Sequence, residues 1–438
     1  MKIYIDTLGC PKNFNDSEMA AGLLEHSGHE IVKVPEDADF IMVNTCGFIN
    51  DAKTESIERI FELAEYKENG AVLAVSGCLS QRYADELFEE MPEVDIFLGV
   101  NDYNKLPDIL DGFEAGNREK HRGDYCVEFE ESMLRKLEDN PYTATLRISE
   151  GCNNLCAYCV IPHIRGKFRS RKQEDIVREA EWLVQQGTKE IILIAQDVTS
   201  YGIDLYGDYV LPQLLKKLCR IDGLKWLRLM YCYEDRITDE LIQVMAEEEK
   251  ICNYIDIPLQ HCSDAVLKAM NRRSTNSSIR ETIGKLRTAM PDINIRTTFI
   301  VGFPGETEDD FEELMDFTEE MCFERLGVFT YSMEEGTPAA EMENQIDEEV
   351  KAERQDAVMR MQVEISLEHN QTMVGKTLDV LVEEIDPEGA YIGRTQYDAP
   401  EIDNSVIFTS DRELVPGDFV KVQINDAFDY DLTGKEVY

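Results

Sequence analysis

Three cysteines in one short segment have the spacing needed to hold a metal cluster. Cys152, Cys156 and Cys159 are separated by three and then two residues, and they follow a segment expected to be a strand, 144–149. Three thiolates on one loop can bind three corners of a four-iron cluster. The fourth iron then stays open to a ligand with amino and carboxylate groups, much as a catalytic zinc keeps an open position. A zinc site that uses Cys156, Cys159 and His163 is the alternative.

A run of cations follows this loop. It contains no acidic residue and comprises Arg165, Lys167, Arg169, Arg171 and Lys172. Because the whole chain is strongly acidic, the run indicates a local anion, and a negatively charged cluster or a ligand carboxylate would fit. An ordinary solvated loop is the alternative.

Three more cysteines share one structural context. Cys10, Cys46 and Cys78 each stand at the carboxyl end of an expected strand. In a parallel sheet those ends lie along one edge, so residues far apart in sequence can meet there. A thiol buried in the core is the alternative at any single position. Plain burial is also what we expect of the cysteines without shared spacing, which are Cys126, Cys219, Cys232, Cys252, Cys262 and Cys322.

The elements that must position these cysteines form three domains. Residues 1–110 alternate between strands and helices, which predicts a doubly wound parallel sheet in an α/β domain. We expect its strands at 2–8, 30–34, 39–44, 71–77 and 94–100, and its helices at 17–27, 51–67 and 83–91. Residues 111–140 are charged and aperiodic, which predicts a linker, with an edge hairpin near 124–130.

The alternation resumes after the linker. Residues 141–372 hold six strand–helix units and a long polar connector helix at 347–372, which predicts a partial (β/α)6 barrel rather than a closed eight-unit one. Its strands are expected at 144–149, 190–195, 226–230, 254–257, 294–301 and 325–331. Residues 373–438 carry short strands punctuated by glycine, which predicts a small antiparallel β-barrel.

Composition narrows the function class. The chain has 88 acidic and 44 basic residues, a net charge of −44, so broad binding to nucleic acid is disfavoured. No apolar run approaches the roughly 20 residues of a membrane span, and no secretory signal precedes the first strand. These features predict a cytoplasmic protein without a membrane partner, and twelve cysteines in such a protein argue against a disulfide framework.

The Cys152–Cys159 spacing, with an aromatic residue before the last cysteine, resembles the signature of the radical S-adenosylmethionine superfamily. The aromatic residue here is Tyr158, and the resemblance implies that it lies beside the adenine of S-adenosylmethionine. Further stretches resemble the strand ends of this superfamily. The resemblance makes Gln196, Gln260 and Gly302 candidate cofactor-binding residues.

The combination of three strand-end cysteines, a radical S-adenosylmethionine barrel and a small terminal barrel resembles the methylthiotransferases along essentially the whole chain. The resemblance implies a first 4Fe-4S cluster on Cys10, Cys46 and Cys78 that handles sulfur. It also implies a second 4Fe-4S cluster, on the barrel cysteines, that binds S-adenosylmethionine. The terminal barrel would be of the TRAM type.

Charge helps to choose among the branches of that family. Residues 373–438 contain five basic and fifteen acidic residues, a poor composition for neutralising phosphates. The segments around Cys152, Ile257–His261 and Tyr397–Asp403 resemble the RimO-type branch, whose substrate is an aspartate of the basic ribosomal protein S-twelve. Asn153 and Leu155 depart from that branch, which often has Asp and Arg there. A transfer-RNA methylthiotransferase is the alternative.

The resemblance implies insertion of a methylthio group at the β-carbon of the aspartate. The barrel cluster would pass an electron to S-adenosylmethionine, the resulting radical would remove a hydrogen atom, and the first cluster would present sulfur. The implied partners are ribosomal protein S-twelve and a reductant such as flavodoxin or ferredoxin. A metal-stabilised binding protein without catalysis is the alternative of another class; it would contain zinc rather than about eight irons.

Overall fold

The computed structural model describes residues 1–114, 116–123, 134–137 and 141–438. Its first domain is built on a parallel six-stranded sheet with the strand order β2-β1-β3-β4-β5-β6. The strands are β1 (Lys2–Thr7), β2 (Glu30–Ile31), β3 (Phe40–Thr45), β4 (Val72–Ser76), β5 (Ile96–Leu98) and β6 (Glu119–His121). Residues 40–45 of the central strand β3 are fully buried, as expected for a strand covered on both faces.

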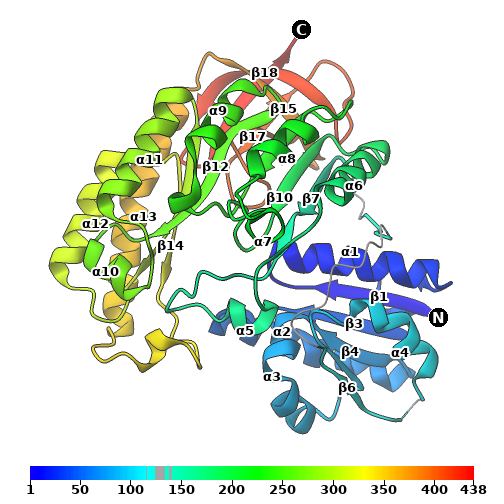
Figure 1. The fold of residues 1–438 in the computed structure, drawn as a ribbon. Coiled ribbons are helices and arrows are strands. Elements are labelled where there is room, and N and C mark those ends of the chain that lie inside the picture. Colours follow the sequence, from blue (N-terminus) through cyan, green and yellow to red (C-terminus); the bar gives the residue numbers. More distant parts are fainter. Residues whose placement is uncertain (115, 124–133, 138–140) are drawn as a thin grey trace.

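Helices cover both faces of this sheet, which confirms the doubly wound architecture (Figure 1). Helices α1 (Pro11–His26) and α4 (Leu106–Gly112) pack on one face, and α2 (Asn50–Ala64) and α3 (Gly77–Glu90) pack on the other. Short 3-10 turns follow at Pro35–Asp37, Glu65–Asn69 and Tyr103–Lys105. Strand β6 lies in the segment expected to be linker, so the sheet extends into it. The hairpin expected near 124–130 lies outside the described residues.

The central domain is an open six-stranded parallel sheet with the order β14-β13-β12-β11-β10-β7, which confirms the partial barrel. Its strands are β7 (Thr143–Arg147), β10 (Glu190–Ile194), β11 (Trp226–Leu229), β12 (Ile251–Gln260), β13 (Asn294–Val301) and β14 (Arg325–Thr330). The helices between them are α6 (Gln173–Gln185), α8 (Leu211–Leu218), α9 (Asp239–Glu247), α11 (Asn276–Ala289) and α12 (Glu308–Met321). The largest buried core of the chain lies between these two layers.

Several short elements of this domain were not expected from the sequence. Strands β8 (Ser149–Glu150) and β9 (Arg169–Ser170) pair antiparallel and close the loop that carries the second set of cysteines. Helix α5 (Ile161–Arg165) follows that loop, and α7 (Ile203–Tyr206) and α10 (Asp264–Ala269) lie farther along the chain. Turns at Glu234–Arg236 and Pro338–Glu341 complete the domain.

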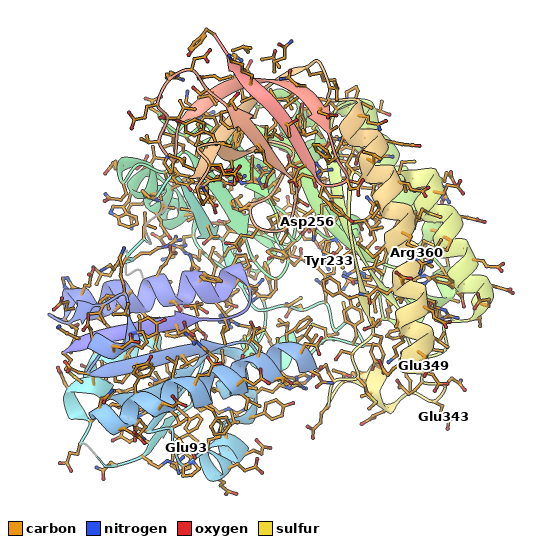
Figure 2. The ribbon with its side chains drawn as sticks, turned by 180° about the vertical axis from the view of Figure 1, so that it is seen from behind. Glu93, Tyr233, Asp256, Glu343, Glu349 and Arg360 are labelled. Atoms are coloured by element: carbon orange, nitrogen blue, oxygen red, sulfur yellow. The ribbon has the colours of Figure 1, made fainter. Side chains whose placement is uncertain are left out.

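The long helix α13 (Glu348–Gln371) runs along the outside of the central domain, with Glu349 near its start and Arg360 near its middle (Figure 2). It leads into a closed barrel with the order β15-β16-β17-β19-β18. Its strands are β15 (Thr377–Ile385), β16 (Tyr391–Thr395), β17 (Ser405–Thr409), β18 (Phe419–Ala427) and β19 (Asp431–Val437). The small barrel is confirmed, with one difference: β17 and β19 pair in parallel, whereas the other pairs are antiparallel.

A buried ion pair network fixes the terminal barrel to the central sheet. Glu190 of β10 accepts a hydrogen bond from Arg228 of β11 at 2.8 Å and another from Arg394 of β16. All three side chains are at most 2% exposed. Burial alone would raise the pKa of Glu190, but the two guanidinium groups lower it to about 2.

Within the described residues, none of the helices combines the length and apolar character needed to cross a bilayer.

Candidate active site

The first three cysteines gather at one edge of the first sheet. Cys10 follows β1 and caps α1, Cys46 follows β3, and Cys78 is the second residue of α3, directly after β4. These three strands are neighbours and run parallel, so their carboxyl ends lie side by side. Cys10 and Cys78 each raise the pKa of Cys46, and Cys10 also raises the pKa of Cys78, which places the three thiols close together. Cys78 thus starts a helix rather than ending a strand.

Glycines beside these cysteines let their loops approach one another. A side chain on Gly9, which has a φ of +93°, would begin 2.8 Å from Cβ of Cys46. A side chain on Gly77, with a φ of +92°, would begin 2.4 Å from the carbonyl oxygen of Thr45. Gly47 packs just as closely against the start of α3. Only glycine fits at these positions, and it brings the three thiols together.

Asn13 and Arg165 tie the three loops to the central domain. The Asn13 amide donates to the carbonyl oxygens of Leu8, at 2.8 Å, and Thr45, at 3.0 Å. Arg165 of α5 donates to Oδ1 of Asn13 at 2.8 Å, and its Nη2 lies 3.5 Å from Sγ of Cys78. A residue only six positions after Cys159 therefore touches the first set of cysteines.

The second set of cysteines lies on the loop between β8 and α5. Cys152 and Cys156 are buried and Cys159 is half-buried. Gly151, with a φ of +76°, allows the loop to cross Lys167, whose carbonyl oxygen would lie 2.2 Å from an added Cβ. The hydroxyl of Tyr233 lies 3.7 Å from Sγ of Cys156. Tyr233 and Asp256 lie on the side of the barrel nearer the first domain (Figure 2). Asp256 is buried, and burial raises its pKa to about 6.

The surroundings of both sets fit metal-bound thiolates. Burial raises the pKa of Cys46 and of Cys152 to about 11, so these thiols ionise only if a cation compensates. Iron bound to sulfur would supply that charge. Among the described residues, no three Cys, His, Asp or Glu side chains converge on a point that could hold a single metal ion. A cluster presents a separate iron to each thiolate.

Buried charges join the two domains beneath the cysteines. Asp16 of α1 accepts from Arg147 at 2.6 Å and from Arg165 at 2.7 Å, and it is 2% exposed. Glu150 accepts from Arg147 at 2.9 Å and from Gln196 at 2.7 Å. Burial alone would raise the pKa of Glu150, but the nearby arginines and Gln196 lower it to about 2. This network holds the two cysteine sets in a fixed relation.

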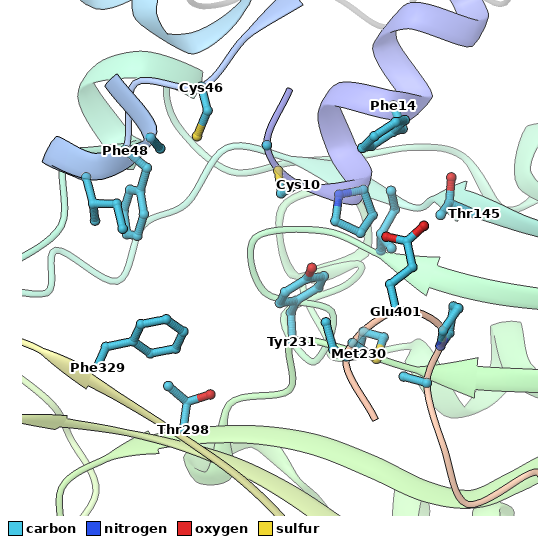
Figure 3. Close-up of a pocket in the computed structure, with 18 of the residues that line it drawn as sticks. Cys10, Phe14, Cys46, Phe48, Thr145, Met230, Tyr231, Thr298, Phe329 and Glu401 are labelled. Carbon is cyan, nitrogen blue, oxygen red and sulfur yellow. The ribbon is translucent and has the colours of Figure 1, made fainter. Parts of the chain in front are cut away.

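A cavity of about 1490 Å³ opens between all three domains. Cys10 and Cys46 reach it from the first domain, and their sulfur atoms point into it (Figure 3). Tyr158, which stands between two cysteines of the second set, lines it from the central domain, and Glu401 lines it from the terminal barrel. A pocket for a drug-sized ligand is about 300–1,000 Å³, so this cavity has room for a cofactor together with part of a larger substrate.

The described lining of the cavity is acidic as well as apolar. It includes no lysine, arginine or histidine, and its carboxylates are Glu18, Asp51, Glu334, Glu348, Glu383, Glu384 and Glu401. Such a field attracts a cationic ligand and repels a phosphate backbone. Of the four candidate cofactor residues, Tyr158 and Gln260 line the cavity. Gln196 instead donates to Glu150, and Gly302 packs against Lys351.

Sequence reasoning missed the polar residues that start α1. We expected that helix to begin at residue 17, but it begins at Pro11, and Lys12, Asn13, Asn15 and Asp16 are buried in its first turns. Lys12 donates to the carbonyl oxygen of Ala195 at 3.1 Å, across the domain boundary. The run of polar residues directly after Cys10 is the sequence feature that could have indicated this contact between domains.

The remaining cysteines follow the expectation of burial with one exception. Cys219, Cys232, Cys252 and Cys262 are buried, whereas Cys322 is exposed. Cys322 ends α12 in a left-handed conformation, with a φ of +45°, which turns it out of the core. Cys126 lies outside the described residues.

Family models match all three domains. Residues 2–99 match the uncharacterized protein family UPF0004, residues 146–318 match the radical SAM superfamily, and residues 374–437 match the TRAM domain. Among solved structures, the radical S-adenosylmethionine methyltransferase TsrM from Kitasatospora setae has a TM-score of 0.55 at 14% identity, over 85% of this chain and 78% of that one. That likeness shows the fold.

Relatives match the whole chain. The ribosomal protein uS12 methylthiotransferase RimO of Desulforamulus reducens is 54% identical over 434 residues, which cover 98% of each chain. The protein of the same name from Clostridioides difficile is 49% identical over 440 residues, which cover 100% of this chain and 99% of that one.

Proposed function

Because the chain belongs to the RimO family of radical S-adenosylmethionine methylthiotransferases, we propose that it adds a methylthio group to the β-carbon of an aspartate in ribosomal protein S-twelve. The proposal includes two 4Fe-4S clusters, one on Cys10, Cys46 and Cys78 and one on Cys152, Cys156 and Cys159. It also includes S-adenosylmethionine, a reductant such as flavodoxin or ferredoxin, and action in the cytoplasm, where ribosomal proteins are made.

One observation carries the proposal. The same cavity is lined by two cysteines of the first set and by Tyr158, which lies within the loop of the second set. Insertion of sulfur at a carbon atom requires that radical formation and sulfur delivery reach the same substrate atom. When bound, the clusters would supply the electron that cleaves S-adenosylmethionine and the sulfur that is transferred.

The residues of the chain have defined tasks in this scheme. Six thiolates hold the clusters, and Arg165 donates toward the sulfur of Cys78. Tyr158 and Gln260 line the space where S-adenosylmethionine would bind. Apolar walls such as Ile192, Ile194 and Phe329 reduce water around a radical, which would otherwise take part in side reactions.

The charge of the cavity supports a basic protein as substrate. Four of its seven carboxylates already pair with arginine or lysine side chains outside the lining: Glu18, Glu334, Glu348 and Glu383. Asp51, Glu384 and Glu401 are the ones that would attract a segment rich in lysine and arginine. A transfer RNA would meet the same carboxylates with a chain of phosphates. The acidic terminal barrel, which contributes Glu383, Glu384 and Glu401 to the lining, adds to this preference.

The test is a direct comparison of substrates. The clusters are reconstituted without oxygen, and the protein is given S-adenosylmethionine, a reductant, and either a peptide of ribosomal protein S-twelve or a transfer RNA. We expect mass spectrometry to find a methylthio gain on the peptide aspartate only. The Cys46→Ala variant should still cleave S-adenosylmethionine but leave the peptide unmodified. A methylthio gain on the RNA would favour the transfer-RNA branch of the family. If neither substrate were modified and the protein contained zinc, a binding protein without catalysis would be favoured.

A further inference from the structure

Several segments of this acidic chain contain no acidic residue, and two of them meet at the second set of cysteines. Although 88 of the 438 residues are Asp or Glu, residues 151–173 and 265–280 have none. The first segment carries the cysteine loop and the cation run, and the second follows the start of α10 and reaches into α11.

These two segments lie against each other in the fold. The side-chain amide of Asn271 donates to the carbonyl oxygen of Leu155 at 2.8 Å, and the amide of Ala157 donates to the carbonyl oxygen of Met270 at 2.9 Å. The two acid-free segments therefore lie side by side at the loop that carries the second set of cysteines.

The cations of these two segments divide into two groups. Arg165 and Arg272 are buried and point inward, toward Cys78 and toward the Tyr233 ring, whose centroid lies 4.4 Å from Arg272. These inward arginines already balance negative charge at the cysteines. Lys167, Lys268 and Arg273 are exposed instead, with 68% of the Arg273 side chain accessible, although its Nη1 lies 4.0 Å from Oδ2 of Asp235. The negative charge of the site does not explain why they point outward.

An apolar side chain stands among the exposed cations. Leu155 is 64% exposed, and its φ of +42° is a left-handed conformation that costs a residue with a Cβ about 1–2 kcal/mol. This conformation occurs between Cys152 and Cys156, on the loop itself. An apolar centre with a charged rim is the usual anatomy of a protein interface.

We propose that Leu155, Lys167, Lys268 and Arg273 form the docking surface for an acidic electron-carrier protein. The inference rests on the proposed function, which requires an electron at the cluster of the second set. One electron leaves the reduced carrier, which is thereby oxidised by one electron. With a cluster bound at the second set, that electron would reduce the sulfonium of S-adenosylmethionine and break one carbon–sulfur bond, which would give methionine and a 5′-deoxyadenosyl radical.

Charge and position favour this partner. The net charge of −44 repels an acidic carrier from the molecule as a whole, so an exposed basic surface beside the cysteine loop would steer it to the place where its electron is needed. None of the four residues lines the cavity, so the carrier and the substrate can bind at the same time. Three exposed cations are few for an RNA, whose affinity depends on neutralising several phosphates.

The test compares two triple variants with the same net charge. The first carries Lys167→Glu, Lys268→Glu and Arg273→Glu. The control carries Lys216→Glu, Lys421→Glu and Lys435→Glu at exposed positions of α8, β18 and β19. Binding of a labelled acidic flavodoxin is followed by fluorescence anisotropy at several salt concentrations. Formation of 5′-deoxyadenosine is measured with reduced flavodoxin and with saturating dithionite, which needs no docking surface.

We expect the first variant to bind flavodoxin at least about tenfold more weakly at low salt and to lose most of the salt dependence. Its rate with flavodoxin should fall in parallel, while its rate with dithionite stays within about twofold of wild type. Leu155→Ser should weaken binding without changing the charge. The control variant should change flavodoxin binding by less than about threefold.

Equal losses in both triple variants, or unchanged flavodoxin binding in the first, would overturn the docking surface. So would a variant that loses affinity for transfer RNA but keeps its affinity for flavodoxin. The proposed function fails separately, if the wild-type protein with dithionite neither cleaves S-adenosylmethionine nor modifies the peptide.

Discussion

Replacing Asp16 with asparagine tests the network that holds the two cysteine sets in a fixed relation. Asp16 lies on α1 of the first domain, and its two oxygens accept from Arg147 and Arg165 of the central domain at 2.6 and 2.7 Å. Asparagine has nearly the same shape but no charge. In the variant, Glu150 is the remaining carboxylate that contacts both buried guanidinium groups, at 2.9 and 3.6 Å.

The expected cost follows from burial. All three side chains of the two Asp16 ion pairs are at most 11% exposed. Removing one partner of a buried ion pair typically costs about 3–5 kcal/mol when the other charge is left uncompensated. Because Glu150 still faces both guanidinium groups, we expect the lower end of that range, about 3 kcal/mol. At about 1.4 kcal/mol for each factor of ten, the domain interface should open roughly two orders of magnitude more often.

Hydrogen exchange measured by mass spectrometry detects such opening segment by segment. Amides of α1 and α5 should lose protection in the Asp16→Asn variant, and sulfur insertion should fall while cleavage of S-adenosylmethionine persists. The matched control is Asp6→Asn, since Asp6 pairs with Arg59 inside the first domain and both are partly exposed. The free energy of opening at the interface amides is the quantity that decides. If it fell by less than about 1 kcal/mol in the Asp16 variant, or only as much as in the control, the network would not hold the domains together.

Three further predictions concern the cluster loop, the barrel contact and the cavity. Cys156→Ala should abolish cleavage of S-adenosylmethionine while iron bound by the first domain remains; continued cleavage would contradict the assignment. Glu190, with a pKa lowered to about 2, should contribute about 3 kcal/mol of stability. That contribution should be complete above its unfolded pKa of about 4.3 and decline as the pH falls toward 2, so unfolding of Glu190→Gln should depend less on pH in this range. Glu401→Lys should raise the KM for the basic peptide roughly fivefold at low salt and less at high salt, whereas Glu388→Lys, outside the cavity lining, should not.

The sequence predicted the architecture well because its signals are local. Strand β13 begins and ends at the expected residues, since a buried apolar run and nearby turns define it. The convergence of Cys10, Cys46 and Cys78 was predicted from one rule of parallel sheets, and the neighbouring strands β1, β3 and β4 confirm it.

Contacts between domains could not be predicted from the sequence. The first turns of α1 look like a solvated loop because Lys12, Asn13 and Asp16 are polar, yet they are buried by a domain that begins more than a hundred residues later. The run after the cysteine loop looked like one group of cations, but Arg165 points inward and Lys167 outward. Such differences depend on tertiary partners that local spacing does not reveal.

The central claim is that two separate sets of three cysteines each hold a four-iron cluster at one cavity. Iron analysis with Mössbauer spectroscopy, on protein reconstituted without oxygen, tests it most directly in the wild type and in two variants that replace either set with alanine. We expect about eight irons in the wild type and about four in each variant, all in 4Fe-4S clusters. Zinc in place of iron, four irons in the wild type, or loss of all iron from either variant would contradict it.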